Sequence, residues 1–312
     1  EEFNDEDEYE VILDITHSFR STAFWMFLVM TYLTDVSNKN IKIIEVTYGM
    51  HEITRKNDDS SPIILLNSFL EILNWIKGAS ELKQYGNSYY ILENLKGNKD
   101  IPKEIEKELE NFSNAMNMNY VGSLLESLDK LADLEKDKKL DSIVGPAKHI
   151  IPDVLRKFIY DFDIRESNDN RRKYLLQATL AKWHFEQKRY AMAYININES
   201  IIGFIMDALD LPLLTGDKKK DENKLAKDWL NMIISRHEAN KIYPNFKVDK
   251  DNQELHEYIK IFEHSRRVRN EIAHSIGGKD SAVNDINSLK NYCEKIIDLL
   301  KNRGFIIRKD EE

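Results

Sequence analysis

The chain has 312 residues, which is enough for about two domains, and its formal net charge of −9 excludes a generic nucleic-acid coat, so any nucleic-acid contact must be a local basic patch. Gly (11) and Pro (6) are scarce, which favours helices over turn-rich β architecture. The single cysteine, Cys293, excludes an internal disulfide framework and a cysteine-based zinc site, and it fits a reducing cytoplasm.

The chain begins with the acidic run "EEFNDEDEYE" rather than with Met, and we expect further sequence upstream of residue 1. We find no signal peptide, and the longest apolar run, "FWMFLVMTYL", is about half of a bilayer span. We therefore expect a cytoplasmic location and no contact with a membrane.

The first elements predict a βαβ unit. Residues 9–15 form a short, β-branched apolar run that is typical of a buried strand, and residues 41–49 form a second one. Residues 21–36 predict a helix that is apolar nearly all round and therefore buried, with Phe24 and Trp25 in the core. Such a unit implies a parallel sheet. Two strands cannot form a covered parallel sheet, so we expect further strands upstream of residue 1 or from another chain.

The loop "THSFRS" lies between the first strand and the helix. A loop at the carboxyl end of a parallel strand is the usual ligand position in an open α/β sheet, and the helix N-terminus behind it favours phosphate. The loop also supplies polar side chains, namely Thr16, His17, Ser18 and Arg20. A capping loop with Ser21 as N-cap is the alternative. It accounts for Ser21 but not for a His and an Arg together in so short a loop.

Residues 14–18, "DITHS", resemble the DxTHG motif of CRISPR-associated CARF domains, with Ser18 at the position of the motif's Gly. The stretch "VTYGMHE" (46–52) resembles the end of the family's second strand, which ends in Tyr-Gly. The resemblance implies a Rossmann-like α/β domain over residues 1–95, without its amino-terminal strands, that binds cyclic oligoadenylate across a dimer axis. The implied ligand-binding residues are Asp14, Thr16, His17, Ser18, Phe19, Arg20, Tyr48 and Gly49.

From Pro62 onward the hydrophobic periodicity is helical. We place a helical linker region at 96–168, because the polar, turn-rich segment 163–173 marks a domain boundary. Residues 169–312 then form an all-α domain. Its first long helical pattern is expected to break near residues 187–190, and "FIIRK" is expected to close the chain as a short strand.

Residues 255–276 predict an amphipathic helix with an unusual polar insertion. Arg266 and Arg269 fall in the middle of the apolar stripe, where a guanidinium is costly unless it is paired or faces solvent. We therefore expect a polar cleft at that turn, flanked by Asn270 and His274 at i and i+4. The stripe itself is Leu255, Tyr258, Ile259, Phe262, Ala273 and Ile276.

An Arg, an Asn and a His without an acidic metal cluster suit a metal-free ribonuclease. The imidazole can move a proton near neutral pH, and the guanidinium can stabilise charge on the phosphoryl oxygens while the RNA 2′-hydroxyl attacks phosphorus. The alternative is that Arg269 forms a salt bridge with an acidic neighbour and His274 merely lies on a polar surface.

The stretch "RNEIAH" resembles the R-x4–6-H motif of HEPN ribonuclease domains, and Glu199 matches the acidic position of the family's early helix. The resemblance implies Arg269, Asn270 and His274 as catalytic residues, in a site that forms where two motifs meet across a dimer axis. The two resemblances together imply a CARF–HEPN effector of type III CRISPR defence. It would be a homodimer that cyclic oligoadenylate activates to cleave single-stranded RNA, with no metal and no cofactor. We expect Arg266, Arg267 and Arg236 to contact the RNA.

Two other functions stay open from the sequence. The chain could be a non-enzymatic regulator that senses a nucleotide, or a constitutive HEPN ribonuclease toxin held by an antitoxin. Metal-free RNA cleavage separates the first from an enzyme, and a rate independent of ligand favours the second.

Overall fold

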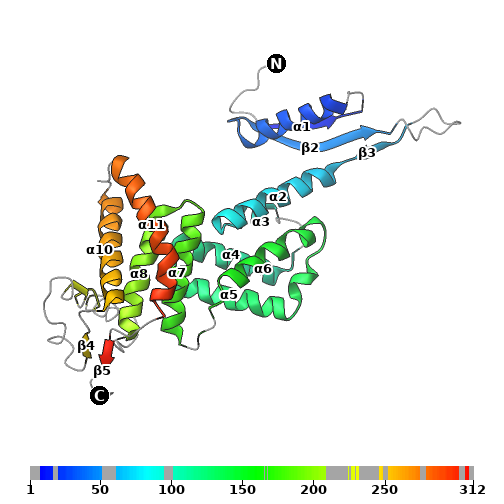
Figure 1. Cartoon of the computed structure of the whole chain (residues 1–312). Helices are drawn as coiled ribbons and strands as arrows, with labels where there is room; N and C mark the ends of the chain where they lie inside the picture. Colours follow the sequence, from blue (N-terminus) through cyan, green and yellow to red (C-terminus); the bar gives the residue numbers. More distant parts are fainter. Residues whose placement is uncertain are drawn as a thin grey trace.

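The computed structural model describes residues 8–16, 20–50, 61–94, 101–164, 166, 168–208, 224, 226–228, 230–231, 246–248, 252–274, 279–301 and 306–308. At residues 20, 22, 94, 246–248, 279–281 and 306–308 the description covers the backbone alone. A small sheet layer is followed by a middle group of helices and then by a second helical region, coloured from blue to red in Figure 1.

The sheet layer confirms the predicted βαβ unit. Strands β1 (Glu8–Asp14) and β2 (Asn40–Gly49) pair in parallel and are joined by helix α1 (Arg20–Asp35). Strand β3 (Ile63–Leu65) pairs antiparallel with the end of β2, so the order is β1-β2-β3. The expectation of a helix directly from Pro62 was wrong for these three residues, because β-branched Ile63 and Ile64 pair with β2 before helix α2 (Asn67–Tyr85) begins.

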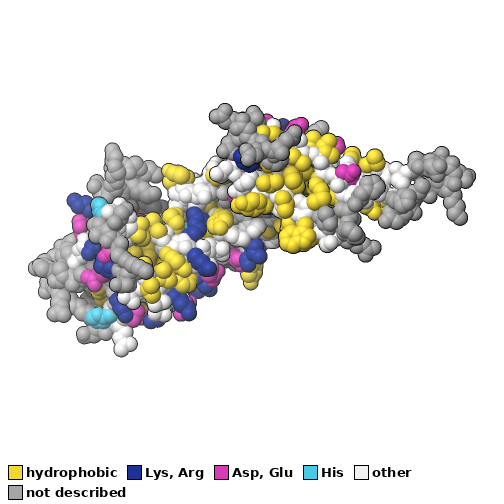
Figure 2. All heavy atoms as spheres, turned by 90° about the horizontal axis from the view of Figure 1, so that it is seen from above, with side chains coloured by type: hydrophobic (Ala, Val, Ile, Leu, Met, Phe, Trp, Pro, Cys, Tyr) yellow, Lys and Arg dark blue, Asp and Glu magenta, His cyan; other side chains and the backbone are white. Residues whose placement is uncertain are grey.

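Helix α1 is largely exposed in the described structure, so the prediction that it is buried was wrong. Phe24 is 63% exposed and Trp25 64%. A helix that is apolar all round is buried only where other elements cover every side, and among the described elements α1 packs on β2. Figure 2 shows apolar side chains gathered over this layer, where Phe69 and Ile76 of α2 are also exposed.

Trp25→Ser is therefore expected to change the free energy of unfolding by less than about 0.5 kcal/mol. It should also lower the fluorescence of a bound hydrophobic dye such as ANS, because apolar surface is removed. Urea denaturation followed by circular dichroism measures the first effect. Trp75 of α2, only 2% exposed, is the matched control, since its change to Ser empties a core position. If both variants lost equal stability, α1 would be covered in solution.

The middle helices surround one hydrophobic core. They are α3 (Tyr89–Asn94), α4 (Lys103–Met118), α5 (Val121–Lys136), the short 3-10 turns η2 (Lys139–Ser142) and η3 (Pro146–His149), and α6 (Ile151–Asp161). Helix α2 inserts Trp75 and Leu82 into this core from the sheet side. Helix α7 (Asp169–Glu186) closes it from the other side with Leu176, Leu180 and Trp183.

The second helical region begins with the same helix α7. Its N-cap, Asn168, accepts hydrogen bonds through Oδ1 from the backbone N–H groups of Asn170 (2.9 Å) and Arg171 (3.0 Å). Helix α7 ends at Glu186 and α8 (Tyr190–Ala208) begins four residues later, which confirms the predicted break. Lys188 in the connecting turn has a φ of +59°.

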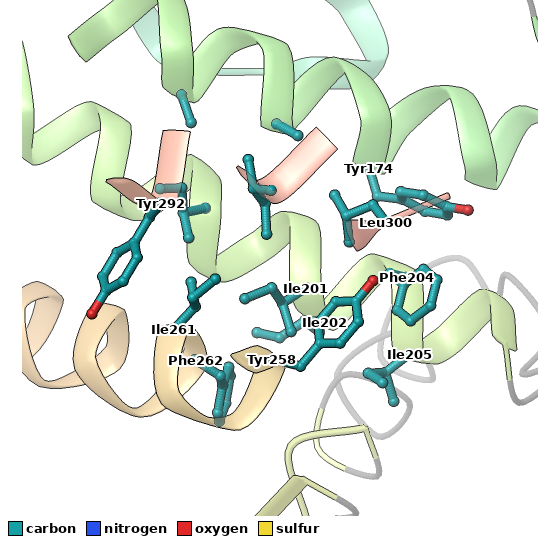
Figure 3. Close-up of a cluster of buried hydrophobic side chains, with 14 of the residues drawn as sticks. Tyr174, Ile201, Ile202, Phe204, Ile205, Tyr258, Ile261, Phe262, Tyr292 and Leu300 are labelled. Carbon is teal, nitrogen blue, oxygen red and sulfur yellow. The ribbon is translucent and has the colours of Figure 1, made fainter. Parts of the chain in front are cut away.

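Helices α10 (Gln253–His274) and α11 (Lys279–Leu299) pack on α7 and α8 around a second core. Figure 3 shows side chains of α7, α8, α10 and α11 converging in this core, among them Tyr174, Phe204 and Tyr258. The expected closing strand is confirmed as β5 (Ile306–Arg308). It pairs antiparallel with an unpredicted strand, β4 (Phe246–Val248), so the region is not all-α as expected.

Candidate functional site

Helix α10 is fixed to α8 by a buried stripe that ends one residue before Arg269. The stripe consists of Leu255, Tyr258, Ile261, Phe262, Ser265 and Val268. Tyr258 stacks on Phe204 of α8 with ring centroids 5.1 Å apart and ring planes inclined by 8°. The predicted stripe is confirmed at Leu255, Tyr258 and Phe262, and half-buried Ile259 packs against the same core. The prediction was wrong at Ala273, which is exposed, and Ile276 lies outside the described residues.

Arg269 lies where this stripe opens, and two side chains of α8 hold it. Its Nη1 donates to Asn198 Oδ1 at 3.3 Å and lies 3.3 Å from Glu199 Oε1. Asn198 is buried and donates through Nδ2 to Ser265 Oγ, also at 3.3 Å, so it bridges the two helices. The guanidinium is thereby fixed at one end while 38% of the Arg269 side chain stays exposed.

The alternative drawn from the sequence was that Arg269 forms a salt bridge with an acidic neighbour, and Glu199 is such a neighbour. Its carboxylate also compensates the charge of a half-buried cation. Asn198 was missed from the sequence. Its signal was its position on a helix rich in apolar residues, where a buried amide needs polar partners.

Asn270 and His274 are exposed, and within the described structure neither forms a hydrogen bond with Arg269. His274 follows Arg269 by five residues, which places the two about 140° apart around the helix axis. The expected i, i+4 flank of Asn270 and His274 is present, but Arg269 points away from it toward α8. One chain therefore presents the guanidinium and the imidazole on different faces of α10.

Of the three arginines expected to contact RNA, two have partners within the chain. Arg266 donates to Asn231 and lies over the ring of Phe262, 5.6 Å from its centroid. Arg267 donates to Glu271 (2.6 Å) and to Asp285 of α11 (2.9 Å), and these bonds raise the pKa of the Arg267 guanidinium above its ordinary value. Arg236 lies outside the described residues.

Asp285 is also the centre of a polar network between α10 and α11. His264 Nε2 lies 2.9 Å from Asp285 Oδ1 and His264 Nδ1 lies 2.7 Å from the hydroxyl of Tyr292. Burial raises the pKa of the Tyr292 phenol. Both ring nitrogens of His264 thus have hydrogen-bond partners, and the network ties the two helices together near the Arg269 turn.

The ends of β1 and β2 are tied by the expected ligand-loop residues. Thr16 donates through its hydroxyl to Asp14 Oδ1 (2.5 Å), and the backbone N–H of Gly49 donates to Thr16 Oγ1 (2.7 Å). A Cβ at Gly49 would lie 2.7 Å from Thr16 Cγ2, so this approach requires glycine. Tyr48 is half-buried beside it. His17, Ser18 and Phe19 lie outside the described residues, as does the side chain of Arg20.

Among the described residues, no three His, Cys, Asp or Glu side chains are grouped so that they could hold a metal ion. In the same part of the chain, no helix combines the length and the hydropathy needed to cross a bilayer.

Comparison with known proteins finds similarity to proteins described as CRISPR-associated. Residues 71–169 match the family model described as "CRISPR-associated protein MJ1674, second domain", a stretch that runs from α2 to the start of α7. The chain is 32% identical over 301 residues to CRISPR-associated protein MJ1674 of Methanocaldococcus jannaschii. That alignment covers 96% of this chain and 42% of the relative, so the chain spans less than half the relative's length.

Among solved structures, the chain is similar to Enterococcus italicus Csm6 bound to cyclic hexa-2′-fluoro-hexa-dAMP. The similarity covers 97% of this chain and 70% of the other, with 14% sequence identity and a TM-score of 0.44.

Proposed function

We propose that this chain is a cyclic-oligoadenylate-activated, metal-independent endoribonuclease that cleaves single-stranded RNA as a homodimer in type III CRISPR defence. The observation that carries the proposal is the Arg269 turn, where a guanidinium held by Asn198 and Glu199 lies on the same helix end as exposed Asn270 and His274. The similarity to a CRISPR-associated protein over nearly the whole chain supports the biological setting.

The reaction would be an intramolecular transesterification, in which the 2′-hydroxyl of the RNA attacks the adjacent phosphodiester. The 2′-oxygen forms a bond to phosphorus as its proton passes to a base, the bond from phosphorus to the 5′-oxygen breaks, and that oxygen gains a proton. The products are a 2′,3′-cyclic phosphate and a 5′-hydroxyl. His274 is suited to proton transfer, and Arg269 to stabilising charge on the phosphoryl oxygens. Asn270 would position the phosphate.

The directions of these side chains support the proposed homodimer. Since Arg269 and His274 face different sides of α10, one chain presents them separately, and two copies meeting at this helix end could bring both pairs to one phosphate. The apolar Ile272, 42% exposed, and Val283 of α11, 61% exposed, are available for such a contact.

RNA cleavage assayed in excess EDTA with a panel of cyclic oligoadenylates tests the proposal. We expect cleavage with one ring size and little without it, and products that carry a cyclic phosphate. Equal cleavage with and without ligand would favour the constitutive toxin. Ligand binding without cleavage under any condition would favour the regulator, and strict dependence on a divalent ion would contradict the metal-free chemistry.

Arg20→Ala is expected to raise the activator concentration for half-maximal cleavage by about tenfold or more, because loss of a charge-assisted hydrogen bond costs about 1.5 kcal/mol or more. The rate at saturating activator should be unchanged, since the Arg269 turn is untouched. Titration of the activator against RNA cleavage measures both quantities. Lys83→Ala, an exposed cation of the adjacent α2, is the control. An unchanged midpoint would show that Arg20 does not contact the ligand.

A further inference from the structure

A cavity of about 450 Å³ lies where the middle helices meet the second helical region. Its size falls within the range of sites for small molecules or single nucleotides. Three segments form its walls: the turn from α4 into α5, the first half of α7, and the second half of α8. The lining residues are Asn119, Tyr120, Val121, Gly122, Ser123, Asn170, Lys173, Tyr174, Gln177, Glu199, Ile202, Gly203 and Met206.

The walls of this cavity are fixed by contacts on both sides. Asn119, in the left-handed conformation with φ 55°, accepts a hydrogen bond at 3.0 Å from Asn196, a fully buried residue of α8. Helices α7 and α8 approach closely at Gly203, where a Cβ would lie 3.0 Å from the Cβ of Tyr174. The cavity is thus a preformed feature of the packing between the two regions.

The lining chemistry suits a nucleotide. Tyr120 is 58% exposed at the rim and offers an aromatic face on which a base can stack. Asn170 and Gln177 offer amides that can bond base edges, and the Oδ1 of Asn170 is buried without a hydrogen-bond partner. Helix α5 begins here without a side-chain cap, so its first N–H groups favour an anion, as does Lys173.

Charge and position select the kind of nucleotide. Lys173 is the only cation among the lining residues and Glu199 is the only carboxylate, which fits the single charge of a phosphodiester better than a triphosphate. Glu199 is also the partner of Arg269, at 3.3 Å. The cavity therefore borders the turn at which cleavage is proposed.

We propose that this cavity is a subsite for the substrate RNA, in which one nucleotide beside the cleaved bond stacks on Tyr120 and places its phosphate near Lys173. The inference builds on the proposed ribonuclease function and deepens it, since the middle helices would then contribute directly to RNA recognition.

The test is direct binding of a fluorescent single-stranded RNA to the full chain carrying His274→Ala, measured by anisotropy, so that cleavage is not the readout. Tyr120→Ala should weaken binding by about 5- to 150-fold, the factor that stacking of one base contributes, and Tyr120→Trp should retain it. Lys173→Ala should also weaken RNA binding. Because this variant would release about one counterion fewer on binding, its affinity should depend less steeply on salt concentration.

Matched controls lie outside the cavity. Tyr160 of α6 is 80% exposed and Lys182 of α7 is exposed, and alanine at either position should leave RNA affinity unchanged. Gly122→Leu provides a second route, because a Cβ at Gly122 meets no atom within 4 Å and the larger side chain would occupy open space at the cavity wall. That variant should fold normally, as thermal unfolding can verify, and bind RNA weakly.

Unchanged RNA affinity in Tyr120→Ala and in Gly122→Leu would overturn the subsite. If the unmutated chain still cleaved RNA, the ribonuclease proposal would stand while the subsite failed. If these variants bound RNA weakly but the unmutated chain cleaved no RNA, the subsite would be supported and the ribonuclease proposal would be contradicted. Binding of adenosine monophosphate that Tyr120→Ala weakens, with RNA affinity unchanged, would make the cavity a small-molecule site and overturn its assignment to RNA.

Discussion

Arg269→Ala and His274→Ala are each expected to lower the rate of RNA cleavage by about 100-fold or more, with activator saturating and EDTA present. Removal of one acid–base group or of one charge-stabilising group from a transition state has effects of this size. Arg269→Lys should recover little of the loss. A planar guanidinium spreads five N–H donors over three nitrogens, so one end can bond Asn198 and Glu199 while the other faces the phosphate, whereas an ammonium holds its three donors on a single nitrogen. Single-turnover cleavage of a labelled RNA is the measurement.

His256→Ala is the control for the histidine, because His256 is an exposed residue of the same helix far from the Arg269 turn. Circular dichroism and activator binding should be normal in every variant, since Arg269 and His274 keep substantial exposure and lie beyond the end of the buried stripe. Full activity in either Arg269→Ala or His274→Ala would show that this turn is not the cleavage site.

Acid is expected to destabilise the fold through His184. This residue of α7 is 1% exposed, its ring lies against Trp183 with centroids 5.0 Å apart, and neither ring nitrogen has a hydrogen-bond partner in the described structure. Burial, with the nearby positive charge of Arg189, lowers the pKa of His184 from 6.5 to about 3.

The sign follows from where protons bind. Above pH 6.5 the ring is neutral in both the folded and the unfolded chain, so His184 adds no pH dependence to the free energy of unfolding in that range. Between pH 6.5 and about 3 the unfolded chain binds a proton that the folded chain excludes, and stability falls as the pH falls. At pH 5 the loss attributable to His184 is about 2 kcal/mol.

Urea denaturation at pH 7 and at pH 5 measures this loss. His184→Leu keeps an apolar side chain in the site and removes the titration, so the variant should be close to the unmutated chain in stability at pH 7 and more stable than it at pH 5. An equal fall in stability for both proteins between these pH values would mean that other groups account for the acid sensitivity.

The parts of the fold that depend on local pattern could be predicted from the sequence. The β-branched runs at β1 and β2, the polar break between α7 and α8, and the length of α10 each follow from periodicity within a few turns of chain. The exposure of α1 could not be predicted, because it depends on which other elements cover the helix, and periodicity carries no such information.

The candidate site divides in the same way. Arg269, Asn270 and His274 stand out in the sequence because their residue types are unusual on one amphipathic helix. Asn198, Ser265 and the cavity beside Glu199 involve residues up to about a hundred positions apart, and only packing brings them together. The direction of Arg269, away from His274, is likewise set by α8 rather than by α10 itself.

The shared position of α7 bears on how a signal could cross the molecule. Because α7 supplies side chains to both cores, the middle helices and the second helical region share this helix as a common wall. Arg189, at the corner between α7 and α8, donates to the backbone oxygen of Tyr85 at the end of α2 at 3.2 Å. A tilt of α2 at the sheet would therefore act as a lever on α8 and on the two residues that hold Arg269. Such transmission would be a rigid-body movement. It would occur on the timescale of domain rotations and would not require a segment to unfold and refold.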